Sequence, residues 1–122
     1  MSKNYKKQIG EKIFTKWNPS ESINMEDITY IEKIKNKNIA IIHLSNNSEH
    51  LDTETLDNFE KDLFDCGFIR VDYGIIANMK YINKIGNDEN GKKFIDLGEK
   101  RIKVSRRRKK NLKKWIDNTD HL

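Results

Sequence analysis

Apolar and polar residues alternate over residues 28–32 and 39–44, which is the pattern of half-buried β-strands. Both segments are rich in β-branched residues, and the polar stretch Lys35-Asn36-Lys37-Asn38 separates them. We therefore predict a β-hairpin whose turn lies at these four residues.

A helical period follows the hairpin. Leu56, Phe59 and Leu63 recur at spacings of three and four, so they share one apolar face of a helix. The helix is expected to begin at Asp52 or Thr53 and to end at Gly67, which favours the left-handed conformation that closes helices. We predict that this single internal helix lies across a sheet.

Further strands are predicted between turn signals. The turns fall at Asn18-Pro19-Ser20, Asp72-Tyr73-Gly74, residues 88–91 and Gly98-Glu99, which combine the residue types that reverse the chain. The strands expected between these turns cover residues 13–17 (with Ile13, Phe14 and Trp17), 68–71, 75–85, 94–97 and 101–104.

The C-terminal segment combines an apolar pattern with strong positive charge. Ser105 follows the last strand at the place of a helix N-cap, and Leu112, Trp115 and Ile116 then recur at helical spacing. A basic helix that docks on the core is therefore expected, with Arg106-Arg107-Arg108 at its N-terminus, where backbone N–H groups favour phosphate.

These elements predict a mainly β fold of short antiparallel sheets with one internal helix and a basic C-terminal helix. A chain of 122 residues is expected to form one domain. We expect residues 1–11 to be a loosely ordered basic N-terminus, residues 12–116 to be the folded domain and residues 117–122 to be a tail.

The positive charge of the chain is concentrated near its C-terminus. Ten basic residues and no acidic one lie between Lys100 and Lys114. Without these ten, 14 Lys and Arg remain against 19 Asp and Glu, so the rest of the chain carries a net charge of −5. Nucleic acid is the expected partner, because each neutralised phosphate releases condensed counterions. A solvated basic tail is the alternative, but the apolar helical face argues against it.

Other function classes lack their signals. The three histidines (His43, His50 and His121) lie far apart in sequence, and no metal-ligand spacing, phosphate loop or nucleophile motif is present. We expect no enzyme activity, no cofactor and no metal site. No apolar run approaches a membrane span, so we expect a cytoplasmic protein without a membrane partner. Cys66, the single cysteine, is expected to fill the core.

Several short motifs point to one family. Residues 27–32 read DITYIE, residues 56–60 read LDNFE, residues 68–71 read FIRV, Asn78 follows, and residues 104–108 read VSRRR. In this order and spacing they resemble a LytTR-type DNA-binding domain, the output domain of many bacterial quorum-sensing and virulence response regulators. The resemblance runs from about Lys12 to Ile116.

The resemblance implies an elongated fold whose loops, and not a recognition helix, enter successive major grooves of double-stranded promoter DNA at repeated sites. Position by position, base contacts would fall on Asn38, Tyr73 and Arg107. Arginine can pair with guanine O6 and N7, and asparagine with an adenine edge. The phosphate contacts that position the domain would be Lys37, Arg70, Arg106, Arg108, Lys109 and Lys110.

The chain departs from the family pattern after Arg70. Asp72 stands where the family usually has histidine, and Gly74 stands where it has serine, which places an anion near the expected phosphate path and removes a hydroxyl donor. Asn78 is retained, and we interpret it as a buried amide that satisfies nearby backbone groups.

Two functions remain open at this point. The first is a sequence-specific transcription regulator without a receiver domain, since only about twenty residues precede the first matched motif. The second is a LytTR-like protein-interaction module that pairs with a full-length regulator and inhibits it. Asp72 and Gly74 favour the second function, and residues 105–110 favour the first. A homodimer, paired monomers on DNA and a partner regulator all remain open.

Overall fold

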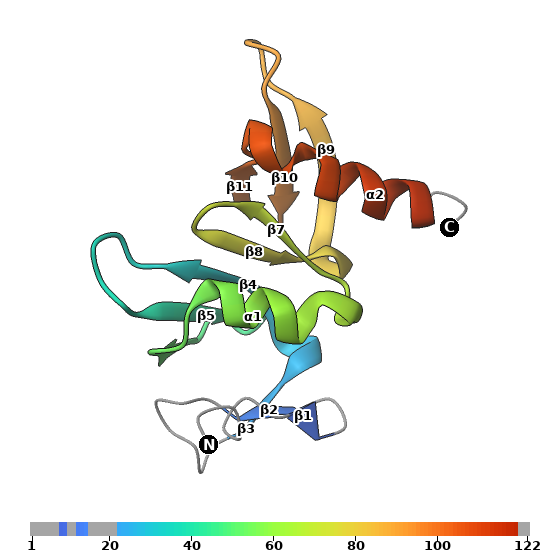
Figure 1. Ribbon diagram of the computed structural model, residues 1–122. Coiled ribbons are helices and arrows are strands. Elements are labelled where there is room, and N and C mark those ends of the chain that lie inside the picture. Colours follow the sequence, from blue (N-terminus) through green and yellow to red (C-terminus); the bar gives the residue numbers. More distant parts are fainter. Residues whose placement is uncertain (1–7, 10–11, 15–21, 120–122) are drawn as a thin grey trace.

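The computed structural model describes residues 8–9, 12–14 and 22–119 and contains three antiparallel sheets. The sheets follow one another along the long axis of the molecule, with the N-terminal sheet at one end and the sheet of β9, β10 and β11 at the other (Figure 1). The mainly β, elongated architecture is as predicted. The strand orders are β1-β2-β3, β6-β5-β4-β8-β7 and β11-β10-β9.

The strands are short, as the sequence predicts. They are β1 (Gln8–Ile9), β2 (Lys12–Phe14), β3 (Ser22–Asn24), β4 (Ile28–Lys33), β5 (Ala40–Leu44), β6 (Glu49–Asp52), β7 (Phe68–Asp72), β8 (Ile75–Asn78), β9 (Ile82–Asn87), β10 (Lys93–Leu97) and β11 (Lys100–Lys103). The helices are α1 (Leu56–Leu63) and α2 (Lys109–Thr119), with short 3₁₀ turns η2 (Met25–Asp27), η3 (Phe64–Cys66), η4 (Met79–Tyr81) and η5 (Arg106–Arg108).

The first predicted hairpin is confirmed. Strands β4 and β5 pair antiparallel with Ile31 opposite Ile42, and both side chains are fully buried. Their connection closes through a hydrogen bond from the Ile34 N–H to the Ile39 carbonyl, at 2.9 Å, and Asn36 adopts a positive φ of 64°. Asparagine tolerates this left-handed conformation better than most residues, so the tetrapeptide forms the turn.

Helix α1 has the predicted buried face but begins later than predicted. Leu56, Phe59 and Leu63 are buried against the five-stranded sheet. The N-cap is Thr55, whose hydroxyl accepts from the Asn58 N–H at 3.2 Å. Asp52, one of the two expected starting residues, ends β6 instead, and its carboxylate accepts from the Glu54 N–H at 2.9 Å. The other expected start, Thr53, also precedes the helix.

The single strand predicted over residues 75–85 is wrong, because the chain breaks at Asn78. The Asn78 side chain caps η4 by accepting from the Lys80 N–H at 3.0 Å, and it donates to the Ile28 carbonyl at 2.8 Å. The chain then enters β9, which belongs to a different sheet. The interpretation of Asn78 as a buried structural amide is thus confirmed.

The second predicted hairpin, β10 with β11, is confirmed, and α2 packs against β7 and against a cluster that this hairpin shares. Ile95, Ile102 and Leu112 share a buried cluster, while Trp115 and Ile116 pack against it as partly buried residues. Ser105 has extended backbone before η5, but no side-chain cap bond forms there, and its N–H donates to the Val71 carbonyl at 2.9 Å. Helix α2 continues to Thr119, into the segment expected to be a tail.

Other expectations have mixed outcomes. Cys66 is half-buried and packs against the core around α1, as predicted, whereas the neighbouring Phe64 is 73% exposed. Strand β2 contains Ile13 and Phe14, while Trp17 and residues 18–20 lie outside the described residues. Gln8–Ile9 form β1 within the segment expected to be loosely ordered. None of the described helices is long and apolar enough to cross a membrane.

Candidate nucleic-acid interface

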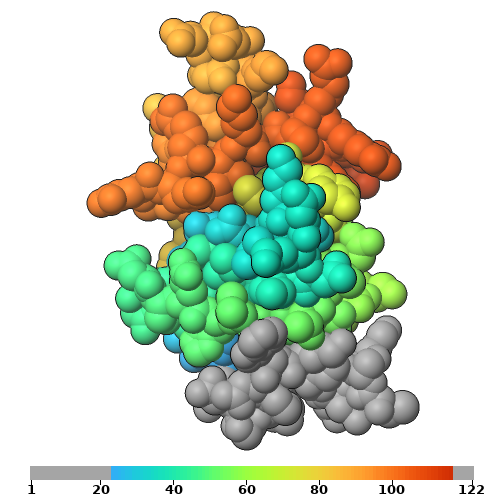
Figure 2. All heavy atoms as spheres, turned by 90° about the vertical axis from the view of Figure 1, so that its left-hand side faces the viewer, coloured from blue at the N-terminus to red at the C-terminus, as the bar shows by residue number. Residues whose placement is uncertain are grey.

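Three segments that the sequence assigns to DNA contact lie on one side of the molecule. The loops between β4 and β5 and between β7 and β8 both point to the left in Figure 1. Figure 2 looks onto this side, where the β4–β5 loop projects at the centre in cyan and the orange residues around 100–110 lie above it. The fold therefore brings together residues that are distant in sequence.

The β4–β5 loop presents its polar side chains to solvent. Lys35, Asn36, Lys37 and Asn38 are all exposed. The loop is closed internally, because the Lys37 N–H also donates to the Ile34 carbonyl at 3.1 Å. Lys37 and Asn38, both expected to contact DNA, are accessible, and Lys35 adds a cation that the sequence reasoning did not single out.

The β7–β8 turn presents Tyr73. This side chain is 72% exposed, although the backbone beneath it is held closely. The Arg70 Nε donates to the Tyr73 carbonyl at 3.0 Å and to the Asp72 carbonyl at 3.2 Å, and the Gly74 carbonyl accepts from the Lys33 N–H at 2.9 Å. An exposed ring on an anchored turn is suited to meeting a partner without reorganising the backbone.

The two departures from the family pattern lie in this same turn. The Asp72 carboxylate accepts from the Gly74 N–H at 3.3 Å, so it closes the turn on itself. The space around Gly74 is open, since the nearest atom to an added Cβ would be the Lys33 Cβ at 4.0 Å. Neither the backbone angle nor crowding therefore requires glycine at this position.

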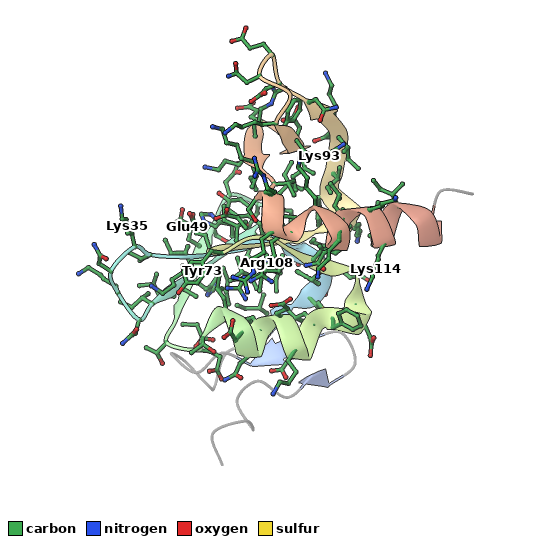
Figure 3. The ribbon with its side chains drawn as sticks, turned by 45° about the horizontal axis from the view of Figure 1, so that its top comes forward. Lys35, Glu49, Tyr73, Lys93, Arg108 and Lys114 are labelled. Carbon is green, nitrogen blue, oxygen red and sulfur yellow. The ribbon has the colours of Figure 1, made fainter. Side chains whose placement is uncertain are left out.

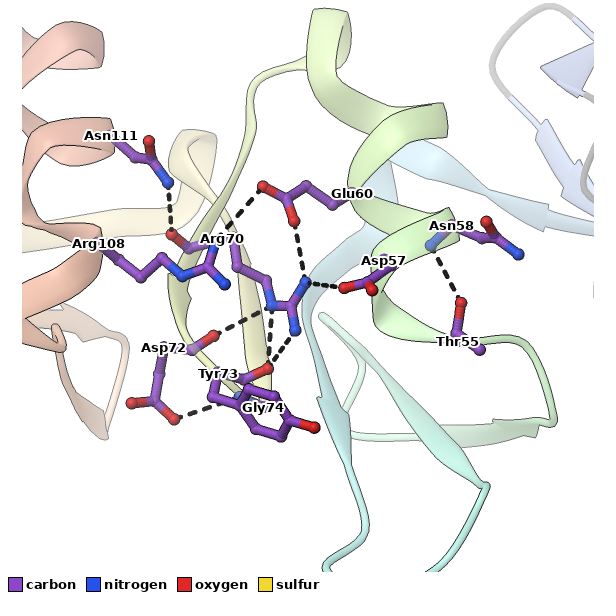
Figure 4. Close-up of polar contacts among 10 residues, drawn as sticks. All are labelled: Thr55, Asp57, Asn58, Glu60, Arg70, Asp72, Tyr73, Gly74, Arg108 and Asn111. Atoms are coloured by element: carbon purple, nitrogen blue, oxygen red, sulfur yellow. Dashed lines mark hydrogen bonds and ion pairs between the residues drawn. The ribbon is translucent and has the colours of Figure 1, made fainter.

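Arg70 does not fit its predicted role as a phosphate contact. Only 4% of its side chain is exposed. Its Nη1 lies 2.9 Å from Asp57 Oδ1 and 2.9 Å from Glu60 Oε1, both on α1 (Figure 4). Each of its three guanidinium nitrogens is already bonded to a carboxylate or a backbone carbonyl, which does not favour a phosphate contact.

The start of the C-terminal helix carries the densest positive charge. Arg106, Arg107, Lys109 and Lys110 are exposed, as their expected roles require. Arg108 is 23% exposed, and its Nη1 lies 3.8 Å from Glu60 Oε2. In Figure 3, Tyr73 appears between Lys35, at the tip of its loop, and Arg108, near the start of α2.

The carboxylates that hold Arg70 were missed from the sequence. Asp57 and Glu60 are three residues apart on α1, so they project from neighbouring positions on one face of the helix. That spacing was visible in the sequence. The sequence did not indicate their partner, because Arg70 lies in β7, which begins after the chain has reversed direction at Gly67.

Arg101, in the basic segment, has an acidic partner on the neighbouring strand. Its Nε and Nη2 lie 2.8 and 3.0 Å from the two Asp96 carboxylate oxygens, and its guanidinium stacks 3.7 Å from the Phe94 ring centroid. This hydrogen bonding lowers the pKa of Asp96 below its ordinary value and raises that of Arg101. The charge of Arg101 is therefore partly neutralised.

His43 contacts two glutamates and a tyrosine of the same sheet. Its Nε2 lies 2.5 Å from Glu32 Oε2, its Nδ1 lies 3.5 Å from Glu49 Oε2, and its ring stacks on Tyr30 with centroids 4.1 Å apart. Burial, followed by the charges of Glu32 and Glu49, raises the pKa of Tyr30.

Within the described residues no group of three or more His, Cys, Asp or Glu side chains could hold a metal ion.

Comparison with known families decides the assignment. The model of the LytTr DNA-binding domain matches residues 20–117. The chain belongs to the LytTR family of DNA-binding domains. The match covers every described element from β3 to η5, and it includes all the residues assigned to DNA contact.

A solved structure shows the same fold. The LytTr DNA-binding domain of a Bacillus cereus protein, described by name as a methyl-accepting/DNA response regulator, superposes with a TM-score of 0.69. The two share 18% sequence identity, and the alignment covers 79% of this chain and 86% of that one. No curated protein sequence matches the chain. The predicted LytTR identity and β-rich fold are thus confirmed.

Proposed function

We propose that this LytTR domain is a transcription regulator that recognises a specific sequence in double-stranded DNA. The observation that carries this proposal is the exposure, on one side of the molecule, of side chains from three separate elements suited to reading bases or gripping phosphates. Membership of a DNA-binding family supports it.

The proposed contacts divide by chemistry. Arg107 reads a guanine through O6 and N7, Asn38 reads an adenine edge, and Tyr73 offers one hydroxyl and a flat ring. The side chains proposed to grip phosphates without reading sequence are Lys37, Arg106, Arg108, Lys109 and Lys110. Arg70 is removed from this set because it is buried in ion pairs.

Selection of duplexes from a random DNA pool by the purified protein tests this proposal. We expect enrichment of a defined motif for the wild-type protein, and loss or broadening of one position for Arg107→Ala. If the enriched pool has no shared motif while binding persists, the domain binds DNA through its backbone alone and the proposal of sequence recognition fails.

A protein-interaction module is the second candidate, because acidic groups border the proposed interface. Asp72 ends β7 at the β7–β8 turn. Asp57 is 86% exposed and pairs with Arg70, which binds the same turn. These carboxylates could meet a cation on a partner regulator as well as repel phosphate. Mobility shifts at low and physiological salt distinguish the two, since a domain with no shift at either salt concentration is not acting on DNA.

Assembly on DNA follows from the same proposal. Repeated sites would be occupied by paired monomers or by a homodimer. Sedimentation of the protein alone and with a duplex carrying one or two copies of the selected motif separates these arrangements. A protein that is dimeric before DNA is added forms a homodimer, and one that pairs only on the two-copy duplex binds as paired monomers.

A further inference from the structure

Arg70 is the only buried cation among the residues whose burial is described, and its guanidinium contacts two parts of the fold while its backbone carbonyl contacts a third. Burying an arginine is costly unless its donors are satisfied by charged or carbonyl partners. Here both kinds of partner are present. Figure 4 shows that they come from the β7–β8 turn and from α1, and that α2 approaches the same residue.

The first attachment is to the turn that carries Tyr73. Nε donates to the carbonyls of Asp72 and Tyr73, and Nη2 donates to the Tyr73 carbonyl as well. Two consecutive carbonyls are therefore turned toward the protein interior. The guanidinium carbon also lies 5.8 Å from the Tyr73 ring centroid, beneath the exposed ring. These bonds fix the backbone from which Tyr73 projects.

The second attachment is to α1 and, through it, to the basic segment. Nη1 lies 2.9 Å from one Glu60 oxygen, while the other Glu60 oxygen lies 3.8 Å from Arg108 Nη1. The backbone carbonyl of Arg70 also accepts from the Asn111 side chain of α2 at 3.4 Å. Arg70 thus connects the Tyr73 turn with the start of the C-terminal helix.

We propose that Arg70 is a positioning residue that holds the Tyr73 turn and the Arg108 segment in the relative geometry that DNA binding requires, without touching DNA itself. This rests on the proposed function. The planar fork of arginine presents donors in several fixed directions, so it can serve the turn carbonyls and the helix carboxylates together. A lysine ammonium at the same position has the charge but not the fork.

The test compares Arg70→Lys with the wild-type protein on a selected duplex and on a scrambled duplex, over a range of salt concentrations. We expect affinity for the selected duplex to fall about tenfold or more, as for loss of hydrogen bonds to a charged group. We expect a smaller fall on the scrambled duplex and an unchanged slope of log affinity against log salt. An equal loss on both duplexes would show that Arg70 acts on all DNA alike, as a phosphate contact does, and would overturn the proposal.

Glu60→Gln is a second variant, and it is less prone to misfold because the Glu60 side chain is 32% exposed on α1. Asp62→Asn, an exposed position on the same helix, is the matched control for removing one negative charge. We expect Glu60→Gln to lower the ratio of selected to scrambled affinity and Asp62→Asn to leave it unchanged. Equal ratios in the two variants would overturn the proposed link between Arg70 and Arg108.

Amide hydrogen exchange at Tyr73 and Gly74, measured without DNA, separates this proposal from the proposed function. Faster exchange in Arg70→Lys, with the exchange of β5 unchanged, supports the anchoring of the turn. Exchange identical to wild type at Tyr73 and Gly74 overturns it. If the wild-type protein selects no motif, the proposed function fails, while the exchange result still decides whether Arg70 fixes the turn.

Discussion

At the scale of single residues, the exposed cations on the proposed interface differ in what they can recognise. Arg107 ends in a planar fork whose two parallel donors match a guanine edge. Lys109 and Lys110 end in a compact ammonium, which is attracted to any phosphate and carries no sequence information. All three are exposed, so their chemistry and not their accessibility separates their expected roles.

Arg107→Ala is expected to weaken binding to the selected duplex by about 1–3 kcal/mol and to relax one base position. Arg107→Lys is the matched control, because it keeps the charge and removes the fork. Competition binding with single-base variants of the selected duplex is the measurement. If Arg107→Ala lowers affinity equally on selected and random duplexes, Arg107 is a phosphate contact.

Lys109→Ala and Lys110→Ala should each weaken binding to all sequences alike and lower the salt slope by about one unit, because one phosphate contact is lost in each. Lys114→Ala is the control on the same helix, at a position well separated from Tyr73 in Figure 3. Affinity measured against salt concentration gives the slopes. Slopes that match wild type for both variants would place Lys109 and Lys110 in solvent.

Asp72→Asn removes the anion in the β7–β8 turn and keeps an oxygen that can accept from the Gly74 N–H. Because a carboxylate within about a Debye length of phosphate repels it, affinity should rise on every duplex, most strongly at low salt. Asp65→Asn, at an exposed position in η3, just after α1, should have less effect. No gain at low salt would show that Asp72 points away from the DNA path.

At the scale of elements, α1 connects the five-stranded sheet to the proposed interface. Its apolar face packs on the sheet through Leu56, Phe59 and Leu63, while Asp57 and Glu60 on another side hold Arg70. The position of the Tyr73 turn therefore depends on a helix that is itself fixed by core packing.

Phe59→Ala should lower the free energy of unfolding by about 3–5 kcal/mol, because Phe59 is fully buried and its loss leaves a cavity under α1. Phe64→Ala is the matched control. Since Phe64 is 73% exposed, its replacement should change stability by no more than about 0.5 kcal/mol. Denaturant unfolding gives both values, and an unchanged midpoint for Phe59→Ala would contradict the packing of α1.

The elements also show which parts of the fold sequence periodicity can predict. The β4–β5 hairpin and the buried face of α1 were predictable because alternation and helical spacing directly report which side of an element is buried. Strand β6 was missed because it is short and half charged, and the break at Asn78 was missed because one side-chain amide interrupts an apolar run.

The candidate site was predictable only in part, for a related reason. Exposed residues such as Lys37, Asn38 and Tyr73 lie in turns that the sequence marks clearly. Arg70 lies in a strand beside such a turn, and its burial depends on Asp57 and Glu60, which reach it only after the chain has folded back. Local sequence patterns carry no information about this contact between Arg70 and the two carboxylates.

At the scale of the whole molecule, charge and shape act together. The segment from Lys100 to Lys114 carries ten basic residues, whereas the remainder of the chain carries a net charge of −5. Such asymmetry orients a protein in the field of a polyanion before contact. The elongated arrangement of three sheets spaces the β4–β5 loop, the β7–β8 turn and the start of α2 along one side.

The central claim is that this side of the domain recognises a DNA sequence, and one comparison tests it most directly. Fluorescence anisotropy at physiological salt would give the affinity for the selected duplex and for a scrambled duplex of the same composition. We expect the selected duplex to bind about 10³-fold or more tightly, the lower range for specific protein–DNA complexes. Equal affinities for the two duplexes, or no binding to either, would contradict sequence recognition.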